Sequence, residues 1–199
     1  MPLSLMGLTL GTSFAAGLNL YATVATLGLL ERFGVVTLPP PLAALGNPVV
    51  IGVALFLYLV EFFADKIPYV DTAWDAIHTF IRPPAAALLA YAAVAGAPET
   101  WRIGAALLAG GVALTSHGTK ATTRAAVNSS PEPISNWVLS ALEDGAAIAL
   151  AWLAAAHPLV TLGIVAGLLL LCIWLLVKLV RFFRGLFRGL VLRRGRAAP

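Results

Sequence analysis

Several charged residues of this chain lie inside or beside long apolar runs. A charge at bilayer depth costs at least about 2.5–3.5 kcal/mol, so such side chains pair, line a wet cavity or sit at an interface. Carboxylates in this setting can bind a cation or carry a proton, and basic groups are their counter-charges or bind anions. The candidates for an ion or solute site are Asn19, Asp65, Asp71, Asp75, His78, Arg82, Lys120, Arg124, Asn128, Glu143 and Asp144.

Arg82 is followed by Pro83 and Pro84. The prolines withhold backbone donors, and the first restricts Arg82 away from the helical region, so the sequence predicts a helix break here. A guanidinium beside freed carbonyls suits a carboxylate or a phosphate. Two interpretations stay open: contact with an anion or lipid phosphate, or an internal salt bridge to Asp75 or Asp144.

Glu143 and Asp144 lie about ten residues into an apolar segment, near mid-bilayer for a straight helix of about 1.5 Å rise per residue. The following Gly145 predicts a second helix break. One interpretation is a cation or proton site in the bundle interior. The other is an ion pair with Arg82 or Lys120 that only locks helices together.

The stretch Asp65–His78 is acidic, and Asp71, Asp75 and His78 share one helical face at i, i+4 and i+7. A solvated face is the plain alternative. The opposing stretch Ser116–Arg124 is basic, with Lys120 and Arg124 one turn apart. The two stretches are therefore predicted to meet.

Asn19 lies within the first apolar segment, where an Asn usually forms an interhelical hydrogen bond; pore lining is the alternative. Enzyme signatures such as HExxH, GxSxG or a Walker loop are absent from the sequence. His78, His117 and His157 have no spacing that supports a metal site. We therefore expect no enzyme, no metal and no cofactor.

The composition predicts an all-α, polytopic membrane protein. The chain is 60% hydrophobic and only 11% charged, against about 25% charged in soluble domains. A run of about 20 apolar residues crosses a bilayer as a helix, and Pro158–Val177 carries no charge. About six transmembrane segments are predicted, some interrupted or re-entrant: Leu3–Leu30, Pro48–Phe63, Trp74–Val94, Ile103–Thr122, Ile134–Ala156 and Pro158–Val180.

Residues 1–180 are predicted to form one transmembrane domain, followed by a basic amphipathic tail, residues 181–199. The stretch Lys178–Arg196 holds seven basic residues and no acidic one. Because it continues an apolar helix, it fits an anionic leaflet rather than nucleic acid. The distribution of Lys and Arg places both termini in the cytoplasm. The expected partners are membrane lipids, an ion or small solute, and a second copy of the chain.

Two internal similarities suggest a repeat. The stretch from Asp65 aligns with that from Asn128, and Ala44–Ala54 aligns with Ala141–Ala151. The second alignment would relate residues 1–96 to residues 103–180 as an inverted pair, an arrangement typical of transporters with a midplane site. Chance is the alternative, because Ala- and Leu-rich sequences resemble themselves easily.

The chain resembles a bacterial family of small multi-pass membrane proteins known only as a domain of unknown function. The resemblance rests on GLNLY (Gly17–Tyr21), EFFADKIPYVDTAWDAIHTFIRP (Glu61–Pro83) and SHGTKATTRAAVNSSPEPISN (Ser116–Asn136). It covers about residues 5–156 and implies no activity. It agrees with a location in the bacterial inner membrane.

The leading hypothesis is a small transporter or channel for an ion or polar solute, with a central site made by the two Pro-containing charged stretches. A lipid or lipid-phosphate translocase, using Arg82, Lys120 and Arg124 on phosphate, is the first alternative. The second is a membrane assembly protein that transports nothing and whose charges only lock helices.

Overall fold

The computed structural model describes residues 2–128 and 133–195, and every regular element within these ranges is helical. The predicted all-α class is confirmed. The elements in chain order are α1 (Leu3–Leu18), α2 (Leu20–Arg32), the 3₁₀ helix η1 (Pro40–Gly46), α3 (Pro48–Ala64), α4 (Pro68–His78), α5 (Arg82–Ala93), α6 (Glu99–Asn128), α7 (Pro133–Ala156) and α8 (Pro158–Gly195).

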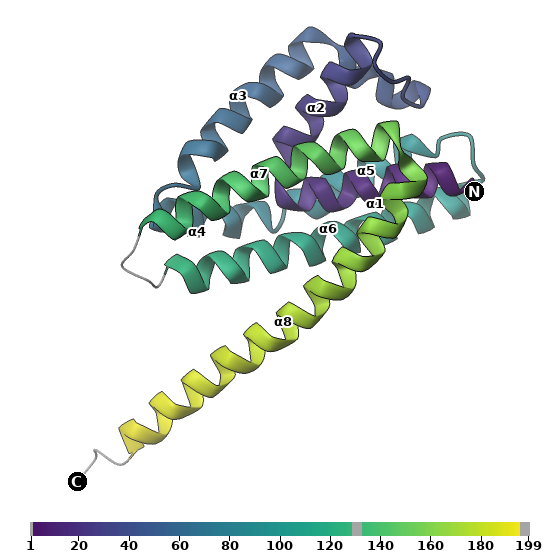
Figure 1. Cartoon of the computed structure of the whole chain (residues 1–199). Coiled ribbons are helices and arrows are strands. Elements are labelled where there is room, and N and C mark those ends of the chain that lie inside the picture. Colours follow the sequence, from purple (N-terminus) through teal and green to yellow (C-terminus); the bar gives the residue numbers. More distant parts are fainter. Residues whose placement is uncertain (1, 129–132, 196–199) are drawn as a thin grey trace.

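Helix α1 is the centre of the bundle and packs against α5, α6, α7 and α8 (Figure 1). Small residues make this possible, because they let helix backbones approach closely. Ala15 and Ala16 are fully buried. A Cβ at Gly7 would overlap the carbonyl of Pro158, and one at Gly17 would overlap the Ser116 hydroxyl.

Three helix interruptions shape the bundle. Asn19 separates α1 from α2, residues 79–81 separate α4 from α5, and Asn47 separates η1 from α3 with a bend of 67°. Helix α5 begins at Arg82 with prolines in its first turn, where proline is tolerated because the N–H has no helical partner. The predicted helix break is therefore confirmed, but it lies at residues 79–81, directly before Arg82-Pro83-Pro84. The expectation that Arg82 itself is not helical is wrong, because Arg82 is the first residue of α5.

The predicted second break, at Glu143-Asp144-Gly145, is wrong. Helix α7 continues without interruption from Pro133 to Ala156. Glycine keeps its backbone N–H and costs a helix only about 1 kcal/mol relative to alanine. Packing of α7 against the central α1 is sufficient to hold the helix through Gly145.

Within the described ranges, two helical stretches are long and apolar enough to cross a membrane: Ile134–Ala156 and Pro158–Phe182. The bent pair of η1 and α3 would make a third. Six spans are not confirmed. The breaks leave α1 with only 16 residues and divide the predicted segment Trp74–Val94 into α4 and α5, and α6 is not among the candidate spans. Large apolar side chains such as Phe56, Leu88 and Leu170 are exposed, as on a lipid-facing surface.

The internal similarities receive uneven support. Asn47 caps the start of α3, whereas Asp144 lies in the middle of α7, so the inverted repeat is not confirmed. In the other alignment, Asp65 caps the end of α3 and Asn128 ends α6. That similarity ends soon afterwards, because α4 stops at His78 while α7 continues. Pro131, which aligns with Pro68, lies outside the described residues.

Helix α8 extends past the rest of the bundle (Figure 1). It is continuous to Gly195, so no helix end marks the predicted start of the tail at residue 181. Residues 196–199 lie outside the described part of the chain. The contact of this segment with an anionic leaflet stays a prediction.

Candidate functional site

A group of buried charged side chains occupies the interior where α3–α7 meet the end of α1. Each member is at most 9% exposed. We call this group the charged cluster; it consists of Glu61, Asp65, Asp71, Asp75, Arg82, Lys120, Arg124, Glu143 and Asp144. The solvated-face alternative for Asp71, Asp75 and His78 is therefore wrong, since that face of α4 points inward.

The break between α1 and α2 supplies backbone groups to this cluster. Asn19 is extended, and its side chain accepts a hydrogen bond from the Ala22 N–H at 2.9 Å, which caps α2. Its amide donates to Asp144 Oδ1 at 2.8 Å, so the predicted interhelical hydrogen bond is confirmed. The last carbonyls of α1, which lack helical donors, lie beside the cluster.

Arg82 binds both the end of α1 and a carboxylate. Its Nη1 donates to the carbonyls of Gly17 and Leu18 at 2.8 and 2.9 Å. Its Nη2 donates to Glu61 Oε1 at 2.6 Å, and Asp75 Oδ1 lies 3.9 Å away. The sequence predicted Asp75 or Asp144 as the salt-bridge partner of Arg82. Asp75 lies at the outer limit of an ion pair with Arg82, and Asp144 accepts a hydrogen bond from Asn19 instead.

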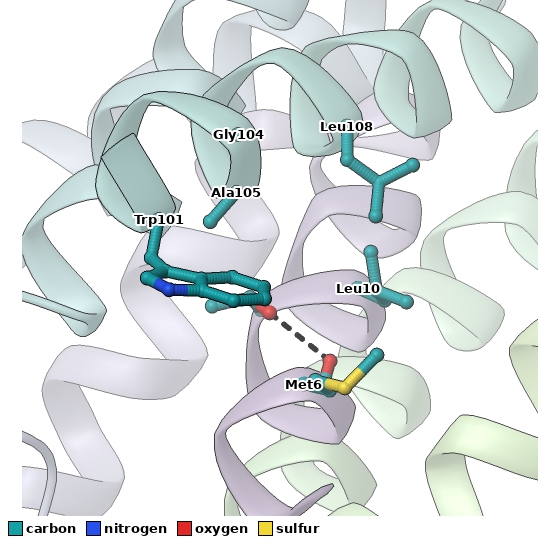
Figure 2. Close-up of a pocket in the computed structure, with 7 residues that line it drawn as sticks. Met6, Leu10, Trp101, Gly104, Ala105 and Leu108 are labelled. Atoms are coloured by element: carbon teal, nitrogen blue, oxygen red, sulfur yellow. Dashed lines mark hydrogen bonds between the residues drawn. The ribbon is translucent and has the colours of Figure 1, made fainter. Parts of the chain in front are cut away.

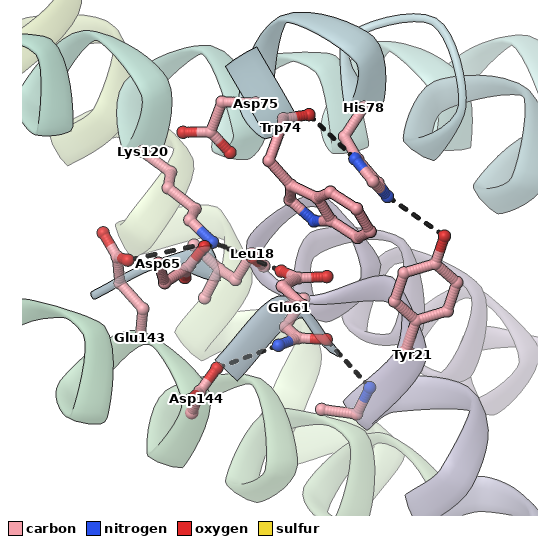
Figure 3. A network of polar contacts seen from close by, with 12 residues as sticks. Leu18, Tyr21, Glu61, Asp65, Trp74, Asp75, His78, Lys120, Glu143 and Asp144 are labelled. Carbon is pink, nitrogen blue, oxygen red and sulfur yellow. Dashed lines mark hydrogen bonds and ion pairs between the residues drawn. The ribbon is translucent and has the colours of Figure 1, made fainter. Parts of the chain in front are cut away.

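Lys120 and Arg124 join the acidic stretch to α6, as predicted. Lys120 Nζ lies 3.0 Å from Asp65 Oδ2 and 3.4 Å from Glu61 Oε1, and it also donates to the Leu18 carbonyl at 3.2 Å (Figure 3). Arg124 Nη2 lies 2.9 Å from Asp71 Oδ1. These pairs bind α3 and α4 to α6 through fully buried groups.

Asp71 lies in α4, outside the candidate membrane spans. Burial raises its pKa to about 6, although hydrogen bonding from Asn128 and the charge of Arg124 both favour the carboxylate. Asn128 Nδ2 donates to Asp71 Oδ2 at 2.6 Å. The last residue of α6 is thereby fixed to the first turn of α4.

Both buried histidines have defined hydrogen-bonding roles. His117 Nδ1 contacts Arg82 Nη1 at 2.9 Å; because a guanidinium only donates, that imidazole is neutral. His78 Nδ1 donates to the Trp74 carbonyl at 2.8 Å, and its Nε2 lies 3.0 Å from the Tyr21 hydroxyl. Figure 3 shows His78 between Trp74 and Tyr21.

The cluster contains more negative than positive groups. Among the described residues, six carboxylates and three basic side chains are buried together. Several carboxylate oxygens also find no hydrogen-bond donor in the described part of the chain: Glu61 Oε2, Asp65 Oδ1, both oxygens of Asp75, Glu143 Oε2 and Asp144 Oδ2. A buried charge without compensation is strongly disfavoured, so this arrangement favours binding of protons or cations.

Three of the hollows in the described structure differ in the groups on their walls. A cavity of about 160 Å³ between α4 and α6 is bordered by Asp75 and Arg124. A hollow of about 250 Å³ between α1 and α6 has mainly apolar walls, with Met6, Leu10 and Trp101 among them (Figure 2). The largest, about 580 Å³ among α2, α3 and α5, is also apolar. Only the first brings charged groups to its wall.

Every sequence-predicted site residue contributes to this region, and the structure adds others. Asn128 reaches it through Asp71. Glu61 and His117 were missed as site residues although both contact Arg82, as was Asn136, whose carbonyl and side chain accept from Arg124. Glu61 had one sequence signal: it is a single acidic residue near the end of an apolar run.

The fold and the site define an all-helical protein with apolar helices suited to a membrane and an ion-paired polar interior. The chain belongs to the family described as "Domain of unknown function (DUF4126)", whose sequence model matches residues 6–178. The family membership predicted from the sequence is thereby confirmed. No curated protein and no solved structure matches the chain.

Proposed function

We propose that this protein is a small membrane transporter or channel that moves a cation along the charged cluster. The observation that carries the proposal is the imbalance of six buried carboxylates against three buried basic groups. An imbalance of this kind in a low-dielectric interior raises the affinity for positive charge. Ionisable groups within membrane segments commonly mark ion pathways and proton relays.

The interrupted helix at Asn19 gives further support. Transporter sites near the bilayer midplane are often built from discontinuous helices whose broken ends face the ion. Here the Gly17 and Leu18 carbonyls meet Arg82 at the break. Asp144 lies ten residues into the candidate span that begins at Ile134, which is about 15 Å along a helix and about half of a hydrocarbon core.

The same geometry disfavours a site for a lipid phosphate. Arg82, Lys120 and Arg124 are each at most 2% exposed and each already pairs with a carboxylate. An added phosphate would increase the negative excess. A cation is therefore the better ligand class for this interior.

The proposed setting is the bacterial inner membrane with the basic C-terminal end of α8 in the cytoplasm. The expectation that the N-terminus is also cytoplasmic is not retained, because Gly7 lies against Pro158, at the opposite end of the candidate span Pro158–Phe182. The distribution of Lys and Arg supports this orientation. In it, the basic end of α8 meets the anionic leaflet, which attracts basic segments. The turn from α3 to α4, with Asp65 and Lys66, then lies on the cytoplasmic side.

Flux through purified protein in liposomes tests the proposal. We expect the wild type to move a cation down an imposed gradient, as followed by a pH-sensitive dye and by potassium- and sodium-sensitive dyes. Glu143→Gln is expected to reduce the flux. Glu143 Oε2 lies 3.7 Å from Arg124 Nε and 3.9 Å from Lys120 Nζ, and it has no hydrogen bond within the described residues. Glu99→Gln is the matched control, since its carboxylate is 59% exposed.

The outcomes separate the candidate functions. If the wild type moves no cation above the level of protein-free liposomes, the transport proposal fails and a role as an assembly protein is favoured. If Glu143→Gln and Glu99→Gln both retain wild-type flux, the charged cluster is not the pathway.

A further inference from the structure

The small cavity between α4 and α6 lies between the charged cluster and the surface. Its walls come from two helical stretches, Thr72–Thr79 and Ala121–Ala125. Ala76 and Ala125 are exposed at its edge, whereas Asp75 and Arg124 are buried. Its volume of about 160 Å³ has room for water, since one water needs roughly 10–15 Å³ of such space. We call it the α4–α6 cavity.

Asp75 is the member of the charged cluster that is least satisfied and borders this cavity. It is only 3% exposed, and neither of its carboxylate oxygens has a hydrogen-bond donor among the described residues. In Figure 3 the Asp75 carboxylate stands apart from the dashed contacts. Among the described residues, the cationic group nearest to its carboxylate is Arg82 Nη2, 3.9 Å from Asp75 Oδ1. Burial of a charge is costly unless the charge is paired and hydrogen-bonded, and Asp75 has neither kind of contact at close range in the described structure.

Arg124, the other charged group at the cavity wall, is already occupied. Its Nε and Nη2 donate to Asp71, its Nη1 donates to Asn136, and its Nη2 also donates to the Asp65 carbonyl. It is therefore not available to neutralise Asp75. Asp75 is therefore the charged side chain at the α4–α6 cavity that has no hydrogen-bond donor among the described residues.

The charged and titratable groups around Asp75 come from five helices. On its own helix they include His78, whose ring bonds to Trp74 and Tyr21, and on α6 they include His117, whose Nε2 lies 3.1 Å from the Asp75 carbonyl. Arg82 alone among the cations lies within 4 Å of its carboxylate in the described structure. The full set is Glu61, Asp71, His78, Arg82, His117, Lys120, Arg124 and Glu143.

The donor set of the cavity favours a proton over a metal ion. A hard divalent cation takes about six or more oxygen ligands. The described lining supplies one free carboxylate with the hydroxyls of Thr72 and Thr79, and these hydroxyls already engage Asn128 and the Asp75 carbonyl. Within the described ranges, no three His, Cys, Asp or Glu side chains form a metal-binding group. A proton needs a single carboxylate oxygen.

We propose that Asp75 takes up the transported proton from water in the α4–α6 cavity. A hydronium ion gives its proton to one Asp75 oxygen and leaves as water, and the carboxylate becomes a neutral acid. The inference rests on the proposed function and names its cation as a proton. It also assigns the entry point to the cavity between Ala76 and Ala125.

Proton flux in liposomes containing a pH-sensitive dye tests the inference. Asp75→Asn keeps the shape of the side chain but cannot exchange a proton, so we expect a loss on the order of 100-fold, as when a positioned proton-transfer group is removed. Thermal unfolding in detergent checks that this variant folds.

A second pair of variants tests the entry route without altering a charge. Ala76→Leu fills the edge of the α4–α6 cavity and is expected to slow proton flux. Ala73→Leu is its matched control, because Ala73 is also exposed on α4 but does not line this cavity. The control is expected to retain wild-type flux.

The results distinguish this inference from the function on which it rests. A wild type that moves no cation at all overturns both. Wild-type proton flux that survives in Asp75→Asn overturns the role of Asp75 and leaves transport standing. If the protein moves sodium or potassium without acidifying the liposomes, the transported cation is not a proton and that part of the inference is overturned. Equal proton flux in Ala76→Leu and Ala73→Leu overturns the entry route.

Discussion

Two interrupted helices face the charged cluster, and they are interrupted for different reasons. Between α4 and α5 the chain turns at residues 79–81, directly before Arg82, Pro83 and Pro84. Between α1 and α2 it is interrupted at Asn19, with no proline nearby. Both interruptions place polar groups inside the bundle. Only the first has a cause within its own few residues.

The Asn19 interruption is held by tertiary contacts from three other helices. Arg82 of α5 and Lys120 of α6 donate to the last carbonyls of α1, and Asp144 of α7 accepts from the Asn19 amide. Asn19 also caps α2. A proline break is thus determined locally, whereas an asparagine break depends on the assembled bundle. Substitutions on each side of this comparison have different expected effects.

The largest effect is expected for Arg82→Gln, which removes the group that joins the two interruptions. Glu61 would lose its 2.6 Å partner and keep only Lys120, at 3.4 Å. Breaking a buried ion pair on one side costs about 3–5 kcal/mol. We expect the free energy of unfolding in detergent to fall by that amount.

Arg102→Gln is the control for this substitution. Arg102 pairs with Glu99 at 3.1 Å, but the Glu99 side chain is 59% exposed, so the loss should stay below about 1 kcal/mol. Equal losses in the two variants would show that the Arg82 contacts add no stability beyond a surface pair.

Gly17→Ala is expected to have the next largest effect. A Cβ at Gly17 would overlap the Ser116 hydroxyl and lie 2.5 Å from the Ala113 carbonyl oxygen. Overpacking of this kind costs about 1–3 kcal/mol and would move the α1 carbonyls away from Arg82. Thermal unfolding measures the loss. Gly104→Ala should be neutral or stabilising, because nothing lies within 4 Å of its Cβ position.

Asn19→Ala removes both the cap of α2 and the contact with Asp144. Loss of a cap costs about 0.5–2 kcal/mol, so we expect a fall of unfolding free energy in that range or slightly above it. Asn19→Ser keeps an oxygen that can cap α2 and should recover part of the loss. If serine and alanine destabilise equally, the cap contributes nothing and the interruption depends on Asp144 alone.

Pro83→Ala is expected to lower the free energy of unfolding only slightly, by about 0.4–1 kcal/mol, mainly because the unfolded chain gains conformational freedom. The Arg82 contacts would still hold the start of α5 in place. Unfolding in detergent measures this, with the exposed Pro84→Ala as companion variant. A loss as large as that of Asn19→Ala would mean that the proline itself maintains this interruption.

A change in the pH dependence of stability is expected at Asp71. Burial raises its pKa to about 6 from an ordinary value of 3.8. The folded protein therefore holds this proton more tightly than the unfolded chain, so its contribution to stability is complete below pH 4 and is lost as the pH rises through 6. Asp71→Asn should lack this decrease. If the unfolding free energy of Asp71→Asn depends on pH as in the wild type, the loss of stability between about pH 4 and 6 comes from other groups.

The sequence predicted features that depend on a few neighbouring residues. Pro83 and Pro84 predicted a helix break, and the opposite charges of Asp65 and Lys120 predicted that two stretches meet. The type of contact made by Asn19 was also predicted, because an amide inside lipid needs a partner. These features follow from backbone chemistry and charge pairing alone.

The rest depends on packing that the sequence does not display. The end of α1 at Asn19 is accompanied by contacts of Arg82 and Lys120 with the Gly17 and Leu18 carbonyls, which the sequence does not show. The expected break at Gly145 is absent because α7 packs along α1. Arg82 pairs with Glu61 rather than Asp144, a choice among nearby carboxylates that depends on how the helices are oriented.

The order of the charged cluster along the chain has a consequence for biogenesis. Four of its carboxylates, Glu61 to Asp75, lie in or directly after α3 and in α4, yet two of its three basic groups belong to α6. During synthesis, α3 and α4 leave the ribosome before most of their counter-charges exist. Entry of these helices into lipid one at a time would leave carboxylates exposed to hydrocarbon. The segment from α3 to α6 is therefore expected to be inserted as a unit, after Lys120 and Arg124 have been made.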